Sequence, residues 1–246
     1  MAHFFLDESL REEDCRPGSH VSVGGSEAKH AVTVSRVRPG EQLLLGNGAG
    51  LVLRGVVVSA APSELALTVE DAAVTPRPTP RIRLVQALAK GDRDELAVQA
   101  ATELGVDGVI PWAAARSVSR WEGAKIAKGR DRWSSIVREA SKQSIRPWLP
   151  EIADLATTKQ LAVLAASTRM LLLEPTASAR LAGMTALDEG RDIVLVVGPE
   201  GGIAPAELDL LQEAGAVAVR LGETVLRTST AGPAALAVLN AALGRW

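Results

Sequence analysis

The chain has 246 residues, of which 47% are hydrophobic, and a formal net charge of −2. This length allows one large domain or two small ones, and the hydrophobic content is sufficient for a packed core. Because the overall charge is nearly balanced, a nucleic-acid site would have to be a local basic patch.

Cysteine and histidine are too few to suggest a disulfide framework or a zinc site. Cys15 is the single cysteine, and the three histidines (His3, His20 and His30) all lie near the start of the chain. We therefore expect no metal site and a reducing compartment. The N-terminus turns acidic at Asp7, unlike a signal peptide, and no apolar run reaches the roughly 18 residues that span a bilayer. These features predict a cytoplasmic protein.

Residues 1–73 are predicted to form a small β-barrel domain. Short apolar runs at 42–45 and 51–58 are separated by glycines, and residues 65–69 alternate between apolar and polar types. Both patterns are typical of strands. The following segment, 74–80, contains three prolines, which stiffen the chain and block regular pairing. It is therefore predicted to be a linker.

Residues 81–246 are predicted to form an α/β domain with a mostly parallel sheet. Strand-like and helix-like patterns alternate along this part of the chain. Strands are expected at 82–89, 109–112, 170–173, 192–197 and 216–221, and helices at 94–104, 124–145, 205–214 and 233–243. Such alternation indicates a parallel sheet that helices cover on both faces.

Residues 113–148 form a local basic segment. They contain nine Lys or Arg and three acidic residues, and four of the five tryptophans lie in or beside them: Trp112, Trp121, Trp133 and Trp148. Basic side chains bind phosphate, and aromatic rings stack on unpaired bases. The pattern is compatible with RNA binding. A solvated amphipathic helix anchored by its tryptophans would explain it equally well, so both interpretations stay open.

Two glycine-rich loops each follow a predicted strand and precede a predicted helix. The first is Gly198-Pro199-Glu200-Gly201-Gly202-Ile203, and the second runs from Gly222 to Ala231 and holds three candidate helix N-caps, Thr228, Ser229 and Thr230. Parallel strands put such loops at one carboxyl edge, where open α/β folds bind ligands. Neither loop has the GxGxxG or GxxxxGK[ST] pattern of familiar nucleotide sites. A shared ligand site is predicted, with tight turns kept for packing as the alternative.

These loops resemble those of the knotted SPOUT methyltransferases, and more narrowly those of the RsmE family of bacterial 16S rRNA uracil-N3 methyltransferases. GPEGG followed by LGETVLRTSTA is similar to that family's loops, the second of which usually has LGxRILRxETA. Weaker similarities cover nearly the whole chain. They comprise His30 with Ser35–Arg38 and Gly40, Gln86-Ala87-Leu88 with Lys90, Gln99 with Glu103–Val106, Arg116-Ser117-Val118, Trp133, Gln143-Ser144 and Arg146.

The resemblance implies a fold and an activity. The fold is α/β, with a small PUA-like β-barrel domain followed by a trefoil-knotted SPOUT methyltransferase domain. S-adenosylmethionine binds between the knot loops without a metal, and the enzyme is a homodimer. The implied substrate is the N3 of a specific uridine in 16S ribosomal RNA, in the small ribosomal subunit or its precursor.

The resemblance also implies site residues. Cofactor binding is carried over to Leu172, Leu173, Glu174, Gly198, Glu200, Gly201, Gly202, Leu221, Gly222, Val225, Leu226 and Thr228. Candidate RNA-binding residues are Arg36, Arg38, Lys90, Arg116, Arg120 and Arg146. Arg227 is the candidate catalytic residue, because a cation in the second loop could stabilise the uracil anion that forms when N3 loses its proton. A salt bridge that pins the loop is the alternative role.

Three residues depart from the family pattern: Lys142 and Ser229 replace a common Glu, and Thr224 replaces a common Arg. Ser229 cannot supply the negative charge of a glutamate, which favours one rival function, a non-catalytic RNA-binding protein with a degenerate knot domain. The intact glycines of both loops count against it. A SPOUT methyltransferase that acts on transfer RNA and a nucleotide-dependent α/β enzyme of other chemistry are the remaining alternatives.

Overall fold

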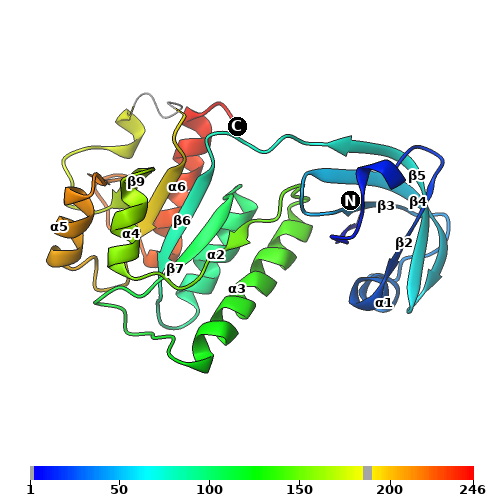
Figure 1. The fold of residues 1–246 in the computed structure, drawn as a ribbon, viewed down its shortest axis with the longest axis horizontal. Helices are drawn as coiled ribbons and strands as arrows, with labels where there is room; N and C mark the ends of the chain where they lie inside the picture. Colours follow the sequence, from blue (N-terminus) through cyan, green and yellow to red (C-terminus); the bar gives the residue numbers. More distant parts are fainter. Residues whose placement is uncertain (1–2, 185–189) are drawn as a thin grey trace. The chain divides into compact units, whose positions relative to one another are not determined.

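The computed structural model describes residues 3–184 and 190–246, and the chain forms two compact units. The first unit comprises Met1–Arg77 together with Ser141–Leu149, and the second comprises Pro78–Ala140 and Pro150–Trp246 (Figure 1). The sequence-based limits of the domains and linker stay a prediction. The structure adds that a distant segment, 141–149, packs with the first unit.

The first unit is built on a curled five-stranded mixed sheet. Strand β1 is parallel to β3, and the other pairs are antiparallel. In the order in which they pair, the strands are β1 (Phe4–Leu6), β3 (Gln42–Gly46), β4 (Leu51–Ala61), β5 (Glu64–Val74) and β2 (His20–Gly24). Three of these strands match the predicted runs. The unit also contains a short 3-10 helix, η1 (Glu12–Asp14), and helix α1 (Gly25–Thr33), which the sequence analysis missed.

Segment 141–149 joins the first unit through backbone and side-chain contacts. The Gly50 N–H donates to the Pro147 carbonyl at 2.9 Å, and the Leu149 N–H donates to the Gly48 carbonyl at 2.9 Å. The buried Lys142 ammonium lies 3.4 Å from Glu27 Oε1 in α1. Lys142 therefore has a structural partner, which accounts for a cation where the family often has an acid.

The second unit contains a six-stranded sheet in which every described pairing is parallel. In the order in which they pair, its strands are β11 (Val217–Val219), β9 (Arg169–Leu173), β10 (Ile193–Val197), β6 (Ile82–Ala87), β7 (Gly108–Trp112) and β8 (Glu151–Ile152). Strand β10 is an uninterrupted apolar run and is buried throughout, as a central parallel strand covered on both faces should be.

Helices cover both faces of this sheet, as the alternating pattern predicted. The helices are α2 (Arg93–Glu103), α3 (Ala124–Gln143), α4 (Thr158–Ala165), α5 (Pro205–Glu213) and α6 (Thr228–Ala242), with a 3-10 turn η2 (Leu181–Gly183). Helices α4 and α5 pack with the face that carries Val85 and Val194. Helices α2 and α6 pack together on the other face, where Gly232 approaches Leu84 (Figure 1).

Helix α6 begins five residues before the predicted start at Pro233, which lies inside it. Its N-cap is Arg227, whose side chain makes no capping hydrogen bond. The prediction of Thr228, Ser229 or Thr230 as the cap was therefore wrong. The Thr228 hydroxyl is instead used in a contact with the first glycine loop, described below. A proline in the helix interior removes one backbone hydrogen bond, which pattern rules treat as a stop.

The chain after β11 lies beside the chain after β9. The Arg220 N–H donates to the Ala179 carbonyl and the Leu181 N–H to the Arg220 carbonyl, both at 2.9 Å. The chain then returns from the sheet edge to its centre as α6, which packs on β10 and β6. This path brings the second glycine loop against the first. None of the helices in the described ranges has the length and apolarity needed to cross a membrane.

Candidate functional site

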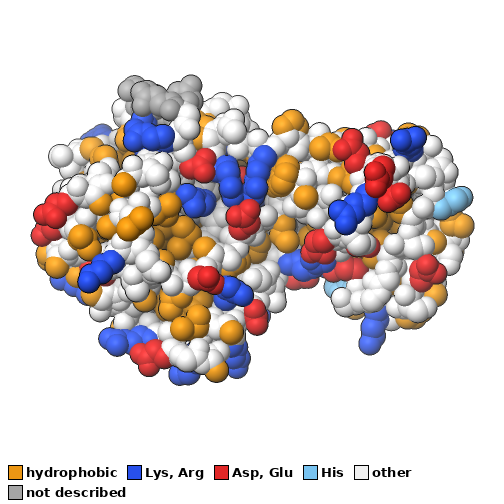
Figure 2. All heavy atoms as spheres, viewed as in Figure 1, with side chains coloured by type: hydrophobic (Ala, Val, Ile, Leu, Met, Phe, Trp, Pro, Cys, Tyr) orange, Lys and Arg blue, Asp and Glu red, His pale blue; other side chains and the backbone are white. Residues whose placement is uncertain are grey.

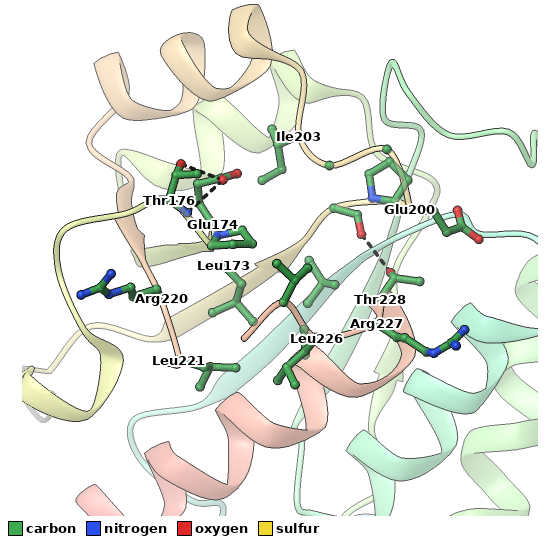
Figure 3. A pocket seen from close by; sticks show the side chains of 18 of the residues that line it. Leu173, Glu174, Thr176, Glu200, Ile203, Arg220, Leu221, Leu226, Arg227 and Thr228 are labelled. Carbon is green, nitrogen blue, oxygen red and sulfur yellow. Dashed lines mark hydrogen bonds between the residues drawn. The ribbon is translucent and has the colours of Figure 1, made fainter. Parts of the chain in front are cut away.

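A pocket of about 610 Å³ opens at the carboxyl edge of the parallel sheet. Three loop segments form most of its wall: 173–176 after β9, 197–203 after β10, and the chain between β11 and α6 (Figure 3). Small-molecule sites typically enclose about 300–1,000 Å³. The two glycine loops therefore meet at one cavity of suitable size, with the end of β9 as a third wall.

All of the predicted cofactor residues except Leu172 line this pocket. Leu172 is fully buried inside β9, between β10 and β11, whereas its neighbours Leu173 and Glu174 reach the cavity. Leu172 lies one residue further inside the strand than Leu173, where β10 and β11 cover it on both sides. The structure thus brings eleven of the twelve candidates together, and the ligand they hold stays a prediction at this stage.

The first glycine loop depends on two of its glycines for its shape. A Cβ on Gly198 would lie 2.9 Å from Ile203 Cγ1, which is too close for the loop to keep its turn. Gly202 has a φ of +72°, in the left-handed region that favours glycine. Its N–H donates to the Pro199 carbonyl at 2.9 Å, which closes the turn. The loop backbone is therefore held against the cavity.

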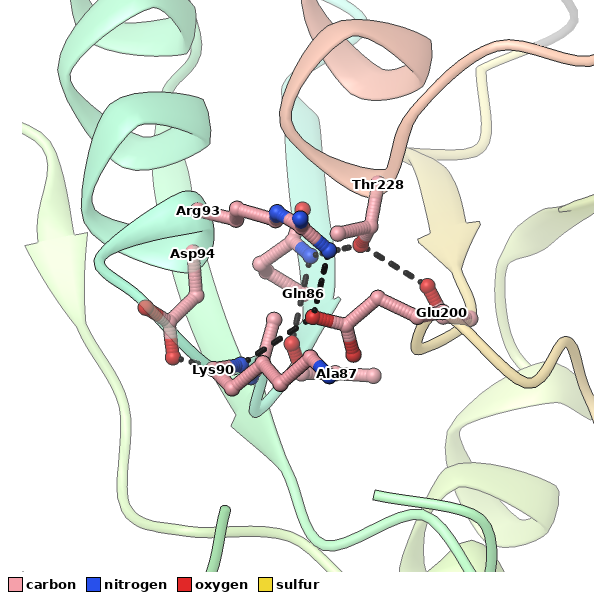
Figure 4. A network of polar contacts seen from close by, with 9 residues as sticks. Gln86, Ala87, Lys90, Arg93, Asp94, Glu200 and Thr228 are labelled. Carbon is pink, nitrogen blue, oxygen red and sulfur yellow. Dashed lines mark hydrogen bonds and ion pairs between the residues drawn. The ribbon is translucent and has the colours of Figure 1, made fainter. Parts of the chain in front are cut away.

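One buried hydroxyl ties the two glycine loops to the central strand. Thr228 Oγ1 donates to the Gly198 carbonyl at 2.9 Å and accepts from Gln86 Nε2 at 2.9 Å (Figure 4). Gln86 is completely buried at the end of β6, and its amide also donates to the Ala87 carbonyl at 3.2 Å. The positions of both loops therefore depend on this one hydroxyl.

Glu200 forms an ionised anchor at one end of the pocket. Its Oε1 accepts from the Lys90 N–H and from Arg93 Nη1, both at 3.2 Å (Figure 4). Burial alone would raise the pKa of Glu200. Hydrogen bonds from its own N–H and that of Lys90, together with the charge and hydrogen bond of Arg93, outweigh that effect and lower the pKa. The carboxylate therefore stays charged at neutral pH.

The opposite end of the pocket carries Glu174 and Arg220 (Figure 3). Glu174 Oε1 accepts from the Thr176 hydroxyl at 3.0 Å. Arg220 lies 3.5 Å from Glu223, which also pairs with Arg180 at 2.8 Å. Between the two ends, the lining is mainly apolar, with Leu173, Ile203, Leu221 and Leu226. An amphipathic ligand with polar groups at both ends would fit this distribution.

Arg227 lies at the same end of the pocket as Glu200 (Figure 3). Its carbonyl accepts from the Thr230 and Ala231 N–H groups at the start of α6, and its side chain is exposed. Within residues 3–184 and 190–246, no ion pair holds its guanidinium. The salt bridge considered as its alternative role is therefore not formed in that part of the chain.

The candidate RNA residues fall into separate groups. Arg116 lines the main pocket and donates through Nη1 to the Gly201 carbonyl at 2.9 Å. Lys90 and Arg120 border two smaller hollows of the second unit. The other three candidates, Arg36, Arg38 and Arg146, belong to the first unit. On the face shown in Figure 2, Lys and Arg are interspersed with Asp and Glu rather than gathered in one patch.

Most tryptophans of the basic segment serve packing. Trp112 and Trp133 are fully buried, and Trp148 donates to the Thr75 carbonyl at 2.8 Å while Arg77 stacks on its ring. Of these three, only Trp133 lies on α3 and anchors that helix as the solvated-helix interpretation proposed, whereas Trp112 belongs to β7 and Trp148 follows the helix. Trp121 is half-buried and differs from them, since it lines two hollows.

Sequence reasoning missed several pocket residues. The most informative is Arg93, which lines the pocket and pairs with Glu200. It is the first residue of α2, and the residue before it, Asp92, has a φ of +57°. A charged Asp-Arg-Asp triplet at the start of this helix was the available signal. Among the residues that the structure describes, no cluster of three or more His, Cys, Asp or Glu is placed to hold a metal ion.

Comparison with known proteins agrees with this geometry. An RNA methyltransferase domain family matches residues 75–240, and an RNA methyltransferase PUA domain family matches residues 23–70. The chain is 45% identical to ribosomal RNA small subunit methyltransferase E of Mycobacterium bovis, covering 93% of this chain and 89% of the relative. It is 30% identical to the Bacillus subtilis protein of that name, covering 98% and 96%.

Solved structures agree as well. The fold matches ribosomal RNA small subunit methyltransferase E from Neisseria gonorrhoeae bound to S-adenosylmethionine, with a TM-score of 0.86, 27% identity and 98% coverage of both chains. The fold and the two-loop pocket thus define an RNA methyltransferase with a PUA domain. The chain belongs to the ribosomal RNA small subunit methyltransferase E family. The resemblance drawn from the glycine loops and the predicted fold class are confirmed.

Proposed function

We propose that this protein transfers a methyl group from S-adenosylmethionine to the N3 of a uridine in 16S ribosomal RNA, in the small ribosomal subunit or its precursor. The observation that carries the proposal is the single pocket in which both glycine loops meet. The proposal is supported by the family to which the chain belongs, since its relatives are named ribosomal RNA small subunit methyltransferases. Such a substrate would place the reaction in the cytoplasm.

The pocket lining suits S-adenosylmethionine. Leu173, Leu221 and Leu226 offer apolar surface for an adenine ring, and the glycine-loop backbone offers N–H and C=O groups for its edge. When bound, the cofactor supplies an activated methyl group on a sulfonium. The protein then has to orient the acceptor base and stabilise the charge that the base develops.

Charged side chains at the Glu200 end of the pocket suit a uracil acceptor. Uracil N3 becomes nucleophilic only when its proton leaves, and the negative charge then spreads over N3, O2 and O4. Arg93, Arg116 and Arg227 all line this pocket, and Arg93 is neutralised by Glu200. Arg116 already donates to the Gly201 carbonyl, whereas Arg227 has an exposed guanidinium available to face that charge, and we propose Arg227 as the catalytic residue. The identity of the proton acceptor is not part of the proposal.

Mass mapping of ribosomal RNA tests this function directly. A strain that lacks the gene should lose one methyl group on a 16S uridine, and the wild-type gene should restore it. The position of the methyl group on the base is then read from nucleoside standards. An unchanged 16S map with a lost transfer RNA methyl group would support the transfer RNA alternative, and no lost methyl group in either RNA would support the non-catalytic one.

RNA binding is proposed to involve the first domain, residues 1–73, and the basic segment of the second. In a triple variant, Arg116, Arg120 and Arg146 are each replaced by alanine. We expect weaker binding to small subunits and a shallower salt dependence, because each lost phosphate contact lowers the log–log slope by roughly 0.7–0.9. Filter binding at several salt concentrations measures both quantities. Because Arg116 also donates to the Gly201 carbonyl in the main pocket, S-adenosylmethionine affinity is measured on the same variant, and Arg120→Ala with Arg146→Ala, which leaves that contact intact, should keep the wild-type affinity.

The matched control removes exposed positive charge elsewhere in the second unit. Lys159 at the start of α4 and Arg191 just before β10 are both exposed and line none of the three hollows. Their double alanine variant should keep the wild-type slope. If the triple variant also keeps it, the basic segment is only a solvated surface. Arg36 and Arg38 would then be the better RNA candidates.

We also propose that the protein is a homodimer that assembles through the second domain. Exposed apolar side chains in this unit include Leu96 on α2, at 56% exposure, and Val225 in the second glycine loop, at 77%. A dimer that covered the loop would complete the cavity from the partner side. Light scattering should give twice the mass of 25.7 kDa at working concentration. A fully active monomer would refute this arrangement.

A further inference from the structure

A separate hollow of about 310 Å³ lies beyond the carboxyl ends of β6 and β7. Its lining is part apolar and part polar, and most of it comes from the loop that follows β7. The lining residues are Leu88, Ala113–Ala115, Ser117, Ser119, Arg120, Trp121 and Glu122. Arg116 of this loop reaches the main pocket, whereas none of the residues that line the hollow does.

Ser117 gives this hollow an unused hydrogen-bonding group. The side chain is 7% exposed, and its hydroxyl has no hydrogen-bond partner in the described parts of the chain. Leaving a buried hydroxyl unpaired costs free energy, so a native protein seldom keeps one without a reason. A ligand that exchanges a hydrogen bond with Ser117 would satisfy it.

Trp121 supplies an aromatic wall that is held in a fixed position. Its ring packs edge-on against the buried Trp133, with centroids 5.1 Å apart and an interplanar angle of 73°. It also lies so close to Gly129 in α3 that a Cβ at that position would overlap the ring. Glycine in a helix interior disfavours the helix relative to alanine, so its presence here indicates that the approach of the ring matters.

Hydrogen bonds to neighbouring elements hold the loop after β7 in place. The Ala115 N–H donates to Glu207 Oε1 at 2.9 Å, and the same oxygen accepts from the Thr158 hydroxyl at 2.7 Å. Arg116 then bonds the Gly201 carbonyl of the first glycine loop. The loop that lines the hollow is therefore held by Glu207 and linked to the first glycine loop through Arg116.

Both hollows that Trp121 lines carry charges of either sign. The hollow described above has Arg120 and Glu122, and Arg116 lies nearby on the same loop. The other hollow has Asp92, Asp94 and Glu95 together with Lys90 and Arg132, of which Arg132 pairs with Glu95. The loop after β7 therefore carries two arginines, Arg116 and Arg120, that can contact a phosphate backbone beside the hollow.

We propose that this hollow binds an unpaired nucleobase of the substrate RNA that flanks the methylated nucleotide. The base stacks on Trp121 and exchanges a hydrogen bond with the Ser117 hydroxyl, while Arg120 contacts the strand. Target bases for such enzymes must be unstacked, so their neighbours lose a stacking partner that the protein can replace. The proposal rests on the proposed methylation of ribosomal RNA and adds a subsite to it.

The test uses the whole protein and small ribosomal subunits from a strain that lacks the gene. Single-turnover methylation is measured against subunit concentration for Trp121→Ala, Trp121→Phe and Ser117→Ala. Loss of one base–aromatic stack should raise the half-saturating concentration by about 5-fold or more. Phenylalanine, which can still stack, should stay within about 2-fold of the wild type, and Ser117→Ala should raise it by roughly 2- to 10-fold. The control is Trp246→Ala, at an exposed terminal tryptophan.

S-adenosylmethionine affinity and melting temperature are measured on every variant. The affinity should stay at the wild-type value, while Trp121→Ala should lower the melting temperature through lost packing and Ser117→Ala should not. If the wild type methylates subunits and both Trp121→Ala and Ser117→Ala saturate as it does, the subsite proposal is overturned. Equal defects in Trp121→Phe and Trp121→Ala would also overturn it, because stacking is then not the requirement. Should Trp121→Ala unfold, Ser117→Ala and Trp121→Phe decide the question. A wild type that methylates no subunit would instead overturn the proposed function.

Discussion

Replacing Arg227 by alanine should lower the single-turnover rate of methyl transfer by roughly 100-fold or more, which is the size of effect seen when a charge-stabilising donor is removed. S-adenosylmethionine affinity should change little. The exposed guanidinium has no ion-pair partner within the described ranges, so its removal breaks no contact that holds the loop. The loss should appear mainly in the transition state.

The position of Arg227 explains why such a cation would be kept. It is the N-cap of α6, and its backbone carbonyl accepts the first hydrogen bonds of that helix. A positive side chain beside a sulfonium is unfavourable in the ground state, as is a cation at the positive end of a helix. Negative charge on uracil O2 or O4 would offset both penalties. Because that charge develops as the N3 proton leaves, Arg227 would act on the reacting base.

Two further variants separate catalysis from structure. Arg227→Lys should recover only part of the rate, because a compact ammonium cannot replace the planar donor group of a guanidinium. Arg180→Ala removes an exposed arginine that pairs with Glu223 and does not line the pocket, so it should methylate nearly as fast as the wild type. Wild-type rates for Arg227→Ala would exclude the catalytic role. A joint loss of melting temperature and cofactor affinity would assign it a structural one.

The sequence was sufficient to predict five of the six sheet strands of the second domain, all except the two-residue β8, and the meeting of the glycine loops. Strand β10 is continuous and apolar, and the loop after it is rich in glycine, so local pattern alone locates both. The start of α6 was misplaced because Pro233 is a strong local stop signal. The helix begins earlier, with its first turn closed by the Thr230 and Ala231 N–H groups on the Arg227 carbonyl, and Thr228 is then used in the contact with Gly198.

Contacts between residues that are far apart in the chain could not be predicted from the sequence. Nothing near Glu200 in the chain indicates its pairing with Arg93, which is 107 residues away. The sequence also could not show which residues of the basic segment are accessible. In the structure, Trp133 and Lys142 are buried, whereas Arg116 is exposed and Trp121 is half-buried. Charge and aromatic content were visible in the sequence, but which side chains remained available was not.

The second large effect is expected for Thr228→Val, which keeps the shape of the side chain and removes its hydroxyl. The change leaves the half-buried Gly198 carbonyl and one buried Gln86 N–H without their partner. An unsatisfied buried group costs about 1–3 kcal/mol, and the Gly198 carbonyl costs less because it borders the pocket, so we expect the unfolding free energy to fall by roughly 2–4 kcal/mol.

Cofactor binding should weaken in the same variant, because the hydroxyl joins the two loops that form the cofactor pocket. Calorimetry should show S-adenosylmethionine binding at least about 10-fold weaker, a loss of about 1.4 kcal/mol. Thr228→Ser retains the hydroxyl and should recover most of the affinity and stability. Thr230→Val makes the same change two residues later, at an exposed position of α6, and should behave as the wild type. If Thr228→Val binds the cofactor as tightly as Thr230→Val does, the hydroxyl does not hold the loops together, and their position must depend on the backbone contacts of the glycines alone.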